Sequence, residues 1–533
     1  MIPKACRPLL VLPFILLLMA CHSKKEQETT VNDSNEVIYH IFLRSFYDSD
    51  GDGNGDLKGL QEKLDYLQDL GITAILVTPV NSSKYYHNYF SDDFEKIDPA
   101  YGNDQSFSDL MKAVHQKGMK FYLDMETQYI TEDHAWWKDS YKNPSSKYSN
   151  YIVYNGKDNT DPEPIIFNMK ELPGYNGVKR KVATVNLSNK DVLEYNYTLF
   201  KHWMDPNNDG KFEDGVDGFR LDHAMDDLDW KGKWTGLFEK FWHPLLTRLK
   251  QINPGLMIVA EQANWADYGK DYFEKAGVDR VFAFKLQNAF VSFDKHKLSI
   301  IIDSTFSATP PANQQVVFLE NHDMERSASK FGKDPGKERA GAALNLLVGG
   351  IPSIYYGQEL GMPGTGGFGK FGMTDANDIP RREAFEWYKD DSSKGMALWY
   401  KNTGPWWDST NLKANDGISL EEEKPDTASL YNFYKTLLRL RKSHEALSEG
   451  KYQAVSNNNE QVFTFMRYTK KEKLFIALNL SATEQKAATD INGTGIRQEA
   501  KAVQLYPAAN AEKSLSGDIV LAPYGVYIWK FNE

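Results

Sequence analysis

The chain has 533 residues, of which 62 are Lys or Arg and 73 are Asp or Glu, and its formal net charge is −11. This acidic balance argues against nucleic acid as a partner, because nucleic-acid-binding surfaces need an excess of positive charge. The length far exceeds what one small core needs and fits a large domain with attached modules.

The first 21 residues are predicted to be a secretion signal rather than folded structure. Lys4 and Arg7 give a basic start, and the apolar run at residues 9–20 is too short for an ordinary membrane-spanning helix. The run ends in Leu-Met-Ala-Cys, which resembles a bacterial lipobox, so Cys21 is expected to become the lipidated N-terminus. We therefore predict an outer-membrane lipoprotein of a Gram-negative bacterium, facing the periplasm or the cell surface. The alternative is a conventional secreted protein with a chance cysteine.

A polar stretch without apolar periodicity, residues 22–35, comes next and is predicted to be a flexible tether. It would join the lipid to the folded body. Cys6 would leave with the signal, so the mature chain would hold no pair of cysteines, and no disulfide is expected.

Eight apolar, β-rich runs follow, and helical patterns separate them. They lie at residues 37–42, 73–78, 120–125, 216–221, 256–261, 280–284, 316–320 and 352–356. Such alternation is typical of parallel βα units, and eight parallel strands are the number that closes a barrel. Leucines at helical spacing over residues 57–70, ended by Gly71, predict the first helix. The predicted fold is α/β, a (β/α)8 TIM barrel.

Two parts of the chain do not fit this repeating pattern. Residues 126–188 are rich in Tyr, Asn, Asp and Pro and too long for a simple crossover, so they are predicted to form a rim insertion domain after the third strand. The barrel would then comprise residues 36–125 and 189–443, closed by a helix at 430–447. Residues 444–533 contain alternating runs and are predicted to form a C-terminal antiparallel β-sandwich.

Three of the predicted strands lead into a carboxylate: Asp222, Glu261 and Asp323, with Arg220 and His322 beside them. In a β/α barrel the C-terminal ends of the strands converge on one pit, where the chemistry takes place. Two carboxyl groups are the minimum set for cleaving an acetal through an oxocarbenium-like transition state. Three acids at one rim therefore favour a glycosidase over other reaction classes, the alternative being three unrelated acids.

These stretches, together with FLRSF (Phe42 to Phe46) and IPSIYYGQELGM (Ile351 to Met362), resemble the α-amylase family of retaining α-glucoside hydrolases and transglycosidases. The resemblance covers nearly the whole chain after the leader. It implies a small second domain at the position of the long insertion.

The resemblance also implies a role for each of the strand-end residues. Asp222 would be the nucleophile, and Arg220, on the same face of the strand, is expected to depress the pKa of its carboxyl. Glu261 would be the general acid and base, with a pKa raised by the apolar strand before it. Asp323 would stabilise the distorted sugar, and His322 would bind adjacent hydroxyls.

Two aromatic residues are candidate sugar contacts. Tyr89, in YHNYFSDDF, occupies the place where the family stacks a tyrosine on the sugar being cleaved. Trp265, in a loop predicted on the rim side, is a candidate sugar platform. For both, ordinary packing is the alternative.

The sequence departs from the family at the end of the third strand. The family's Asp-x-x-x-Asn-His reads DMETQY here, so Gln128 and Tyr129 replace the asparagine that binds calcium and the histidine that contacts the sugar 6-hydroxyl. Thr184 stands where the family has a domain-boundary aspartate. We therefore expect the usual α-amylase calcium site to be absent and Tyr129 to contact the substrate instead.

An acidic loop, DSDGDGNGD at residues 48–56, places oxygen-bearing side chains at alternate positions with glycines between them. The spacing is typical of a calcium loop and matches the one after the first strand in the oligosaccharide-cleaving branch of the family. The alternative is a solvated acidic turn, and a similar loop at residues 205–214 leaves a second site open. We expect a structural Ca²⁺ held by the side chains of Asp48, Asp50, Asp52 and Asp56 and the carbonyl of Asn54.

The predicted function is retaining hydrolysis of α-glucosidic bonds in α-glucans or malto-oligosaccharides. An α-glucan transglycosidase or sugar isomerase on the same site is an alternative, since a sugar hydroxyl competes with water for one covalent intermediate. A non-catalytic glucan-binding protein is a second alternative, although all five strand-end residues are present. The sequence leaves open the linkage, α-1,4 or α-1,6, endo or exo action, and the oligomeric state.

Overall fold

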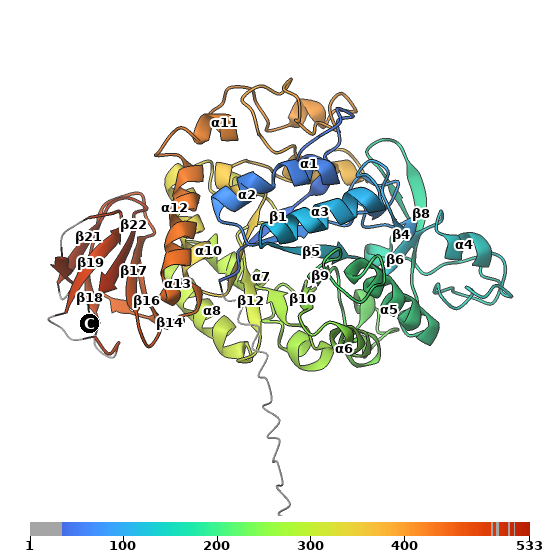
Figure 1. Cartoon of the computed structure of the whole chain (residues 1–533), viewed down its shortest axis with the longest axis horizontal. Coiled ribbons are helices and arrows are strands. Elements are labelled where there is room, and N and C mark those ends of the chain that lie inside the picture. The colour runs from blue at the N-terminus through green and yellow to red at the C-terminus, as the bar shows by residue number, and fades with distance from the viewer. Residues whose placement is uncertain (1–34, 492–493, 497–499, 510–511, 516, 533) are drawn as a thin grey trace, which may run out of the picture. The chain divides into compact units, whose positions relative to one another are not determined.

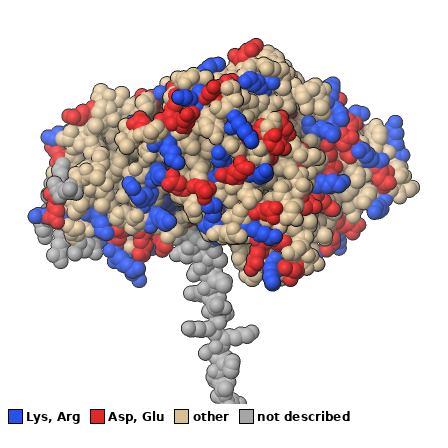
Figure 2. Space-filling view, turned by 45° about the horizontal axis from the view of Figure 1, so that its top comes forward, with Lys and Arg blue, Asp and Glu red and all other residues tan. Residues whose placement is uncertain are grey.

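The computed structural model describes residues 35–491, 494–496, 500–509, 512–515 and 517–532, and these residues belong to one compact unit (Figure 1). The predicted signal, Cys21 and the predicted tether up to residue 34 lie outside the described residues. Among the described residues, no helix has both the length and the apolar character needed to cross a membrane. On the face seen in Figure 2, basic and acidic side chains are interspersed.

Eight parallel strands form a closed barrel in the order β1-β13-β12-β11-β10-β9-β5-β2. Their bounds are β1 Ile38–Ile41, β2 Ala74–Val77, β5 Lys120–Met125, β9 Gly218–Leu221, β10 Met257–Ala260, β11 Arg280–Phe282, β12 Gln314–Val317 and β13 Ile351–Tyr355. Each overlaps one of the eight predicted runs, and the predicted (β/α)8 TIM barrel is confirmed. All but the third and fourth strands end before the predicted runs do, and the largest difference is at β12, which ends at Val317 instead of residue 320.

The barrel strands are buried on both faces, as expected for a parallel sheet covered by helices. Alternate side chains such as Leu76, Tyr122 and Val259 belong to an apolar cluster with Ile38 and Phe282. The other strand faces join a much larger cluster that includes the surrounding helices. Successive side chains of each strand therefore point alternately into the barrel interior and outward to the surrounding helices.

Helices surround the barrel, as Figure 1 shows. The predicted helix at residues 57–70 is divided into two at Lys63, and Gly71 ends the second with a φ of 105° that favours glycine. The predicted helix at 430–447 is divided at His444. The helices of the barrel region are α1 Leu57–Glu62, α2 Leu64–Leu70, α3 Asp104–Gln116, α5 Lys190–Met204, α6 His243–Ile252, α7 Phe284–Phe290, α8 Lys295–Ala308, α9 Ser327–Lys330, α10 Pro335–Leu347, α11 Leu420–Glu423, α12 Leu430–Ser443 and α13 Glu445–Ser448.

The region predicted as an insertion carries a small antiparallel sheet in the order β6-β8-β7. Trp136 and Trp137 of its helix are buried, and the Trp136 ring meets Tyr195 of α5 at 4.8 Å between centroids, so they pack rather than face a cleft. The elements are β6 Tyr129–Thr131, α4 Ala135–Ser140, β7 Glu171–Pro173 and β8 Lys179–Thr184, preceded by the hairpin of β3 Asn81–Ser82 and β4 Asp93–Ile97.

Two antiparallel sheets make up the C-terminal region, with the strand orders β14-β16-β17-β22-β19-β20 and β15-β18-β21. Ile476 and Ile528 of the larger sheet belong to the barrel's apolar cluster, whereas Phe475 and Trp529 belong to a second cluster shared with Ile519 of the smaller sheet. The predicted β-sandwich is confirmed. The strands are β14 Lys451–Ala454, β15 Ser456–Asn457, β16 Val462–Tyr468, β17 Lys473–Asn479, β18 Gln485–Asp490, β19 Lys501–Tyr506, β20 Glu512–Ser514, β21 Asp518–Leu521 and β22 Val526–Phe531.

Candidate active site

A cavity of about 400 Å³ opens where the barrel strands end at their carboxyl termini. Asp222 directly follows β9 and Glu261 directly follows β10, so both side chains reach the rim from neighbouring strands. This is the face on which β/α barrels carry their chemistry. The side chains that line the cavity include Tyr89, Glu126, Tyr129, Asp222, His223, Glu261, His322, Asp323 and Arg382.

The guanidinium of Arg220 is the centre of the charge network beneath the cavity, and its side chain is 1% exposed. Nη1 donates to both oxygens of Asp124, at 2.9 and 2.7 Å, and to Oδ1 of Asp222. Nη2 donates to Oε2 of Glu261 at 2.8 Å. One planar cation therefore binds carboxylates from β5, β9 and β10, and its fixed donor geometry sets where they lie.

Burial dominates the protonation of the two central acids. It raises the pKa of Glu261 to about 7, against the lowering effect of Arg220. It also raises the pKa of Asp222, and the charges of Asp124 and Asp323 add to this. The expectation that Arg220 would hold the pKa of Asp222 below its ordinary value is therefore wrong, because desolvation outweighs the single cation that three carboxylates share.

The pKa of the third acid, Asp323, shifts in the opposite direction. Its Oδ2 lies 3.0 Å from His322 Nε2, and its Oδ1 accepts from Arg382 Nη2 at 2.9 Å. Desolvation raises the pKa of the Asp323 carboxyl, but His322, Arg382 and Arg381 outweigh it and hold the pKa well below its ordinary value. The site thus combines the ionised carboxylate of Asp323 with the carboxyl of Glu261, whose pKa is about 7. Different environments of this kind give carboxyl groups different roles.

Tyr89 lies against His322, with the ring centroids 5.2 Å apart and the planes inclined by 16°. Its hydroxyl donates to Asp124 Oδ2 at 2.7 Å and lies 2.8 Å from His322 Nε2. Because it also lines the cavity, Tyr89 presents a ring fixed by its partners to anything bound there.

Gln128 and Tyr129, which replace the Asn and His of the family's motif, both make side-chain hydrogen bonds. Gln128 is buried, and its Nε2 donates to the backbone carbonyl of Asp222 at 2.5 Å. Tyr129 lines the cavity and donates its hydroxyl to Asp229. Gln128 therefore supports the loop that carries Asp222, and Tyr129 takes part in the cavity wall.

Trp265 is not among the residues that line the cavity, so the structure does not support its predicted contact with the substrate. Its ring stacks on Phe284 at 4.6 Å with an interplanar angle of 6° and is 37% exposed. Phe284 belongs to the apolar cluster inside the barrel, and Trp265 covers it.

Four Asp, Glu or Arg residues that line the cavity were not among the sequence predictions: Glu126, Asp375, Asp378 and Arg382. Glu126 is 4% exposed and accepts from the backbone N–H groups of Gln128 at 2.7 Å and Tyr129 at 3.3 Å. Burial raises the pKa of Glu126 well above its ordinary value, and the charge of Asp222 adds to this. Its place within DMETQY could have identified it, whereas no spacing signal points to Arg382, which follows the eighth strand.

The model of the Alpha amylase catalytic domain matches residues 40–450. The chain belongs to the α-amylase family. Alpha-amylase 3 of Dictyoglomus thermophilum is 30% identical over 508 residues, covering 93% of this chain and 93% of that relative. The probable oligo-1,6-glucosidase 3 of Bacillus subtilis is 26% identical over 567 residues, covering 92% and 98%. The crystal structure of an alpha-amylase from H. orenii has a TM-score of 0.74 at 28% identity, covering 93% of this chain and 99% of that chain.

Membership of the α-amylase family makes this chain a glycoside hydrolase that acts on O-glycosyl bonds. The class predicted from the sequence, a retaining hydrolase of α-glucosidic bonds, is confirmed. The family resemblance drawn from the strand-end motifs is confirmed by the same matches.

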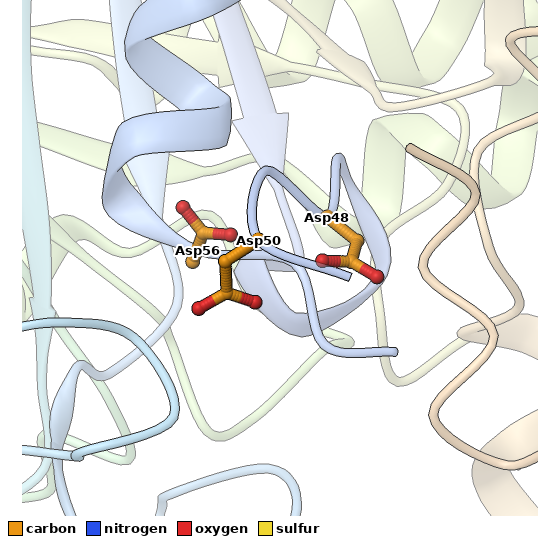
Figure 3. A group of neighbouring side chains, drawn as sticks. All are labelled: Asp48, Asp50 and Asp56. Carbon is orange, nitrogen blue, oxygen red and sulfur yellow. The ribbon is translucent and has the colours of Figure 1, made fainter. Parts of the chain in front are cut away.

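The acidic loop at residues 48–56 brings together three of the four side chains that were predicted to bind Ca²⁺ (Figure 3). Asp48, Asp50 and Asp56 have carboxylate oxygens within 4.8 Å of one another, and the first and last of these side chains are buried. Three carboxylates within this distance are the oxygen donors that Ca²⁺ prefers, so these side chains fit the ion. The Asp52 carboxylate does not join the group.

Asp52 Oδ1 instead accepts a hydrogen bond from the backbone N–H of Asn54 at 2.7 Å. In the loop at 205–214, the Asp205 carboxylate accepts from the N–H groups of Asp209 and Gly210, both at 3.0 Å. Within the described ranges, no group of three acidic side chains at this second loop is close enough to share an ion.

Proposed function

We propose that this enzyme hydrolyses α-glucosidic bonds in α-glucans or malto-oligosaccharides by double displacement, with retention of the anomeric configuration. The observation that carries the proposal is that Asp222 and Glu261 bind neighbouring nitrogens of the Arg220 guanidinium at the cavity. Carboxyl groups held by one guanidinium lie close together, as a retaining enzyme requires, with a typical separation of about 5–5.5 Å.

In the first step Asp222 attacks the anomeric carbon while Glu261 donates its proton to the glycosidic oxygen, and the leaving sugar departs as an alcohol. With a pKa of about 7, Glu261 is mostly protonated below neutrality, as this step needs. Ester formation then removes the negative charge of Asp222, which is one of the groups that raise the pKa of Glu261. The pKa of Glu261 therefore falls, so the carboxylate that has just given its proton to the leaving sugar stays ionised and can accept a proton from the water that hydrolyses the ester.

Three further side chains would hold the sugar at the reacting position. Asp323 is ionised and faces the cavity, so it can stabilise positive charge that develops at the anomeric centre. His322 and Tyr89 are fixed against each other and line the same cavity, where hydroxyl groups and one sugar face can meet them.

We propose a structural Ca²⁺ held by Asp48, Asp50 and Asp56. When bound, the ion would neutralise three neighbouring carboxylates and take no part in the reaction. Asp56 also caps α1 by accepting from Gly59 N at 2.7 Å, so the ion would link the loop to the start of that helix.

We also propose that the enzyme is attached to the outer membrane of a Gram-negative bacterium through lipid on Cys21. The support is the Leu-Met-Ala-Cys sequence after an apolar run and the polar stretch at 22–35 that follows it. An extended tether of this length would let the catalytic body stand off from the bilayer by up to about 50 Å.

Product analysis tests the catalytic proposal. Enzyme lacking residues 1–21 would be incubated with maltoheptaose, pullulan, panose, isomaltotriose or trehalose, beside an Asp222→Ala control. Release of α-anomeric products, followed by proton NMR before mutarotation, is expected from at least one substrate and identifies the linkage. Products that begin as the β-anomer would contradict retention, and dominant transfer products would favour the transglycosidase alternative.

A further inference from the structure

A histidine directly follows the nucleophile Asp222 and lines the same cavity as the catalytic acids. His223 has a φ of 45°, so the chain enters left-handed backbone immediately after Asp222. Residues with a bulky side chain adopt this region only where their neighbours hold them. The backbone N–H of His223 donates to Glu261 Oε2 at 3.3 Å, which places the residue against the general acid as well as beside the nucleophile. Double displacement itself requires no imidazole, so the chemistry of the two carboxyl groups does not explain this residue.

The imidazole of His223 is paired with a buried carboxylate. Its Nε2 lies 3.1 Å from Asp229 Oδ1, and the Asp229 side chain is 1% exposed. The hydroxyl of Tyr129 donates to the same oxygen, and Lys231 Nζ lies 3.1 Å from Oδ2. Burial raises the pKa of the Asp229 carboxyl, but these three hydrogen-bond partners outweigh burial and lower the pKa below its ordinary value. An ionised carboxylate at one ring nitrogen favours the charged form of the imidazole.

The other groups around His223 act in the same direction. Three carboxyl groups influence its charge: Asp229 of the turn η3 (Leu228–Trp230), Asp222 and Glu261. Burial lowers the pKa of the His223 imidazole, but these carboxyl groups outweigh burial and raise the pKa above its ordinary value of 6.5. The rings of Tyr129 and Trp230 also lie near the imidazole, at 5.9 and 6.3 Å between centroids, and bear no charge. The imidazolium form therefore persists to a higher pH than it would in water.

A cation at this position opposes the effect of burial on Glu261. Burial is the main cause that raises the pKa of Glu261 to about 7. The charged side chains that act on it are Arg220 and His223, which lower the pKa, and Asp222 and Asp323, which raise it. Tyr272 also lies near Glu261, and its hydroxyl is neutral because burial raises its pKa. Since Arg220 is shared with two further carboxylates, a second cation adds to the pull on the Glu261 proton.

We propose that the ion pair of His223 and Asp229 holds a positive charge beside Glu261 and so limits the pH range over which that carboxyl stays protonated. His223 is a positioning residue, because it acts on the reaction through Glu261 and takes no part in making or breaking a bond. The proton still passes between Glu261 and the glycosidic oxygen or the attacking water. This inference rests on the proposed function and deepens it, since it adds a group that adjusts the general acid of the same site.

The pH dependence of kcat/KM for maltoheptaose tests the proposal. His223→Asn removes the charge and suits left-handed backbone, which Asn adopts more readily than most residues do. We expect the alkaline midpoint of the profile to rise by at least about 0.5 pH units, because the ionised form of Glu261 loses a neighbouring cation. His223→Arg supplies a positive charge again and should bring the midpoint back toward that of the unsubstituted enzyme.

Variants of the neighbouring turn test the pairing. Asp229→Asn should move the midpoint in the same direction, because the imidazole loses the carboxylate at Nε2. The double variant should shift no further than His223→Asn alone, since Asp229 acts through the charge of His223. Asp227→Asn is the matched control and should leave the midpoint unchanged. Asp227 directly precedes this turn, accepts from the backbone N–H of Gly232 at 2.9 Å and is not among the residues that line the cavity.

α-Glucosyl fluoride separates an effect on Glu261 from a structural effect. Fluoride leaves without a proton, so kcat/KM for this substrate does not require protonated Glu261, and its profile should lack the alkaline limb in every variant. An unchanged midpoint in His223→Asn would overturn the proposal, as would a shift that His223→Arg does not reverse or additive shifts in the double variant. An equal loss on both substrates at every pH would indicate a structural role for His223 and would also overturn it. If the unsubstituted enzyme turns over neither substrate, the proposed function itself fails.

Discussion

Replacing Glu261 by Gln is expected to stabilise the folded enzyme above neutral pH while abolishing hydrolysis. Burial raises the pKa of this carboxyl from an ordinary value of 4.5 to about 7. At about 1.4 kcal/mol for each pH unit, this shift corresponds to about 3 kcal/mol. Gln has the shape of the protonated acid and never bears the charge, so it avoids this cost.

The sign of the effect depends on pH. Between pH 4.5 and about 7 the folded enzyme binds more proton at Glu261 than the unfolded chain does, so stability falls as the pH rises through this window. The Gln variant should therefore be more stable than the unsubstituted enzyme by about 3 kcal/mol at pH 8 and by almost nothing at pH 4. For a chain of about 500 residues, with an unfolding entropy of about 2.1 cal/mol/K per residue, this raises Tm by about 3 °C at pH 8.

Scanning calorimetry at both pH values measures the difference. Glu274→Gln is a matched control, since the Glu274 side chain is 51% exposed and its replacement should change Tm little at either pH. A Glu261→Gln variant that is no more stable than the unsubstituted enzyme at pH 8 would refute the reasoning. An equal gain at pH 4 and pH 8 would also refute it, because the gain would then not come from the buried charge.

Three other predictions concern catalysis, the metal loop and the membrane. kcat/KM for maltoheptaose should fall about tenfold per pH unit above about pH 7 because Glu261 must be protonated; a flat profile to pH 9 would contradict this. Chelation with EDTA should lower Tm, and Asp48→Asn or Asp56→Asn should remove that response; an EDTA effect that survives both changes would place the ion elsewhere. Cys21→Ser should move the enzyme from the membrane to the soluble fraction of cells, and retention in the membrane would exclude the lipid anchor.

The barrel was predictable because its strands are short apolar runs with helical patterns between them, and all eight runs became strands. The sequence did not predict where those elements end. The leucine spacing over 57–70 continues through Lys63, where the structure begins a second helix. The predicted strand at 316–320 is the strand Gln314–Val317, since the chain leaves the sheet before it reaches the catalytic rim.

The catalytic acids were predictable because they stand in long motifs at strand ends. Arg220 and His322, which lie beside these acids in the sequence, were also predicted, but Arg382 was not, because it binds Asp323 across 59 residues of sequence. The pKa of Asp222 depends on how deeply it is buried and on how many acids share Arg220, and neither follows from the spacing of two residues. Trp265 follows a barrel strand in a predicted rim loop, where a residue that lines the cavity could also stand. In the structure its ring packs on Phe284 instead.

The central claim is that Asp222 forms a covalent glycosyl-enzyme intermediate. 5-Fluoro-α-glucosyl fluoride tests it most directly, because the ring fluorine slows breakdown of the intermediate while the leaving fluoride allows it to form. Intact-mass spectrometry should detect one added fluoroglucosyl group per chain, and peptide mapping should locate it on Asp222. A label on another residue, or full turnover by an Asp222→Ala enzyme, would contradict the account.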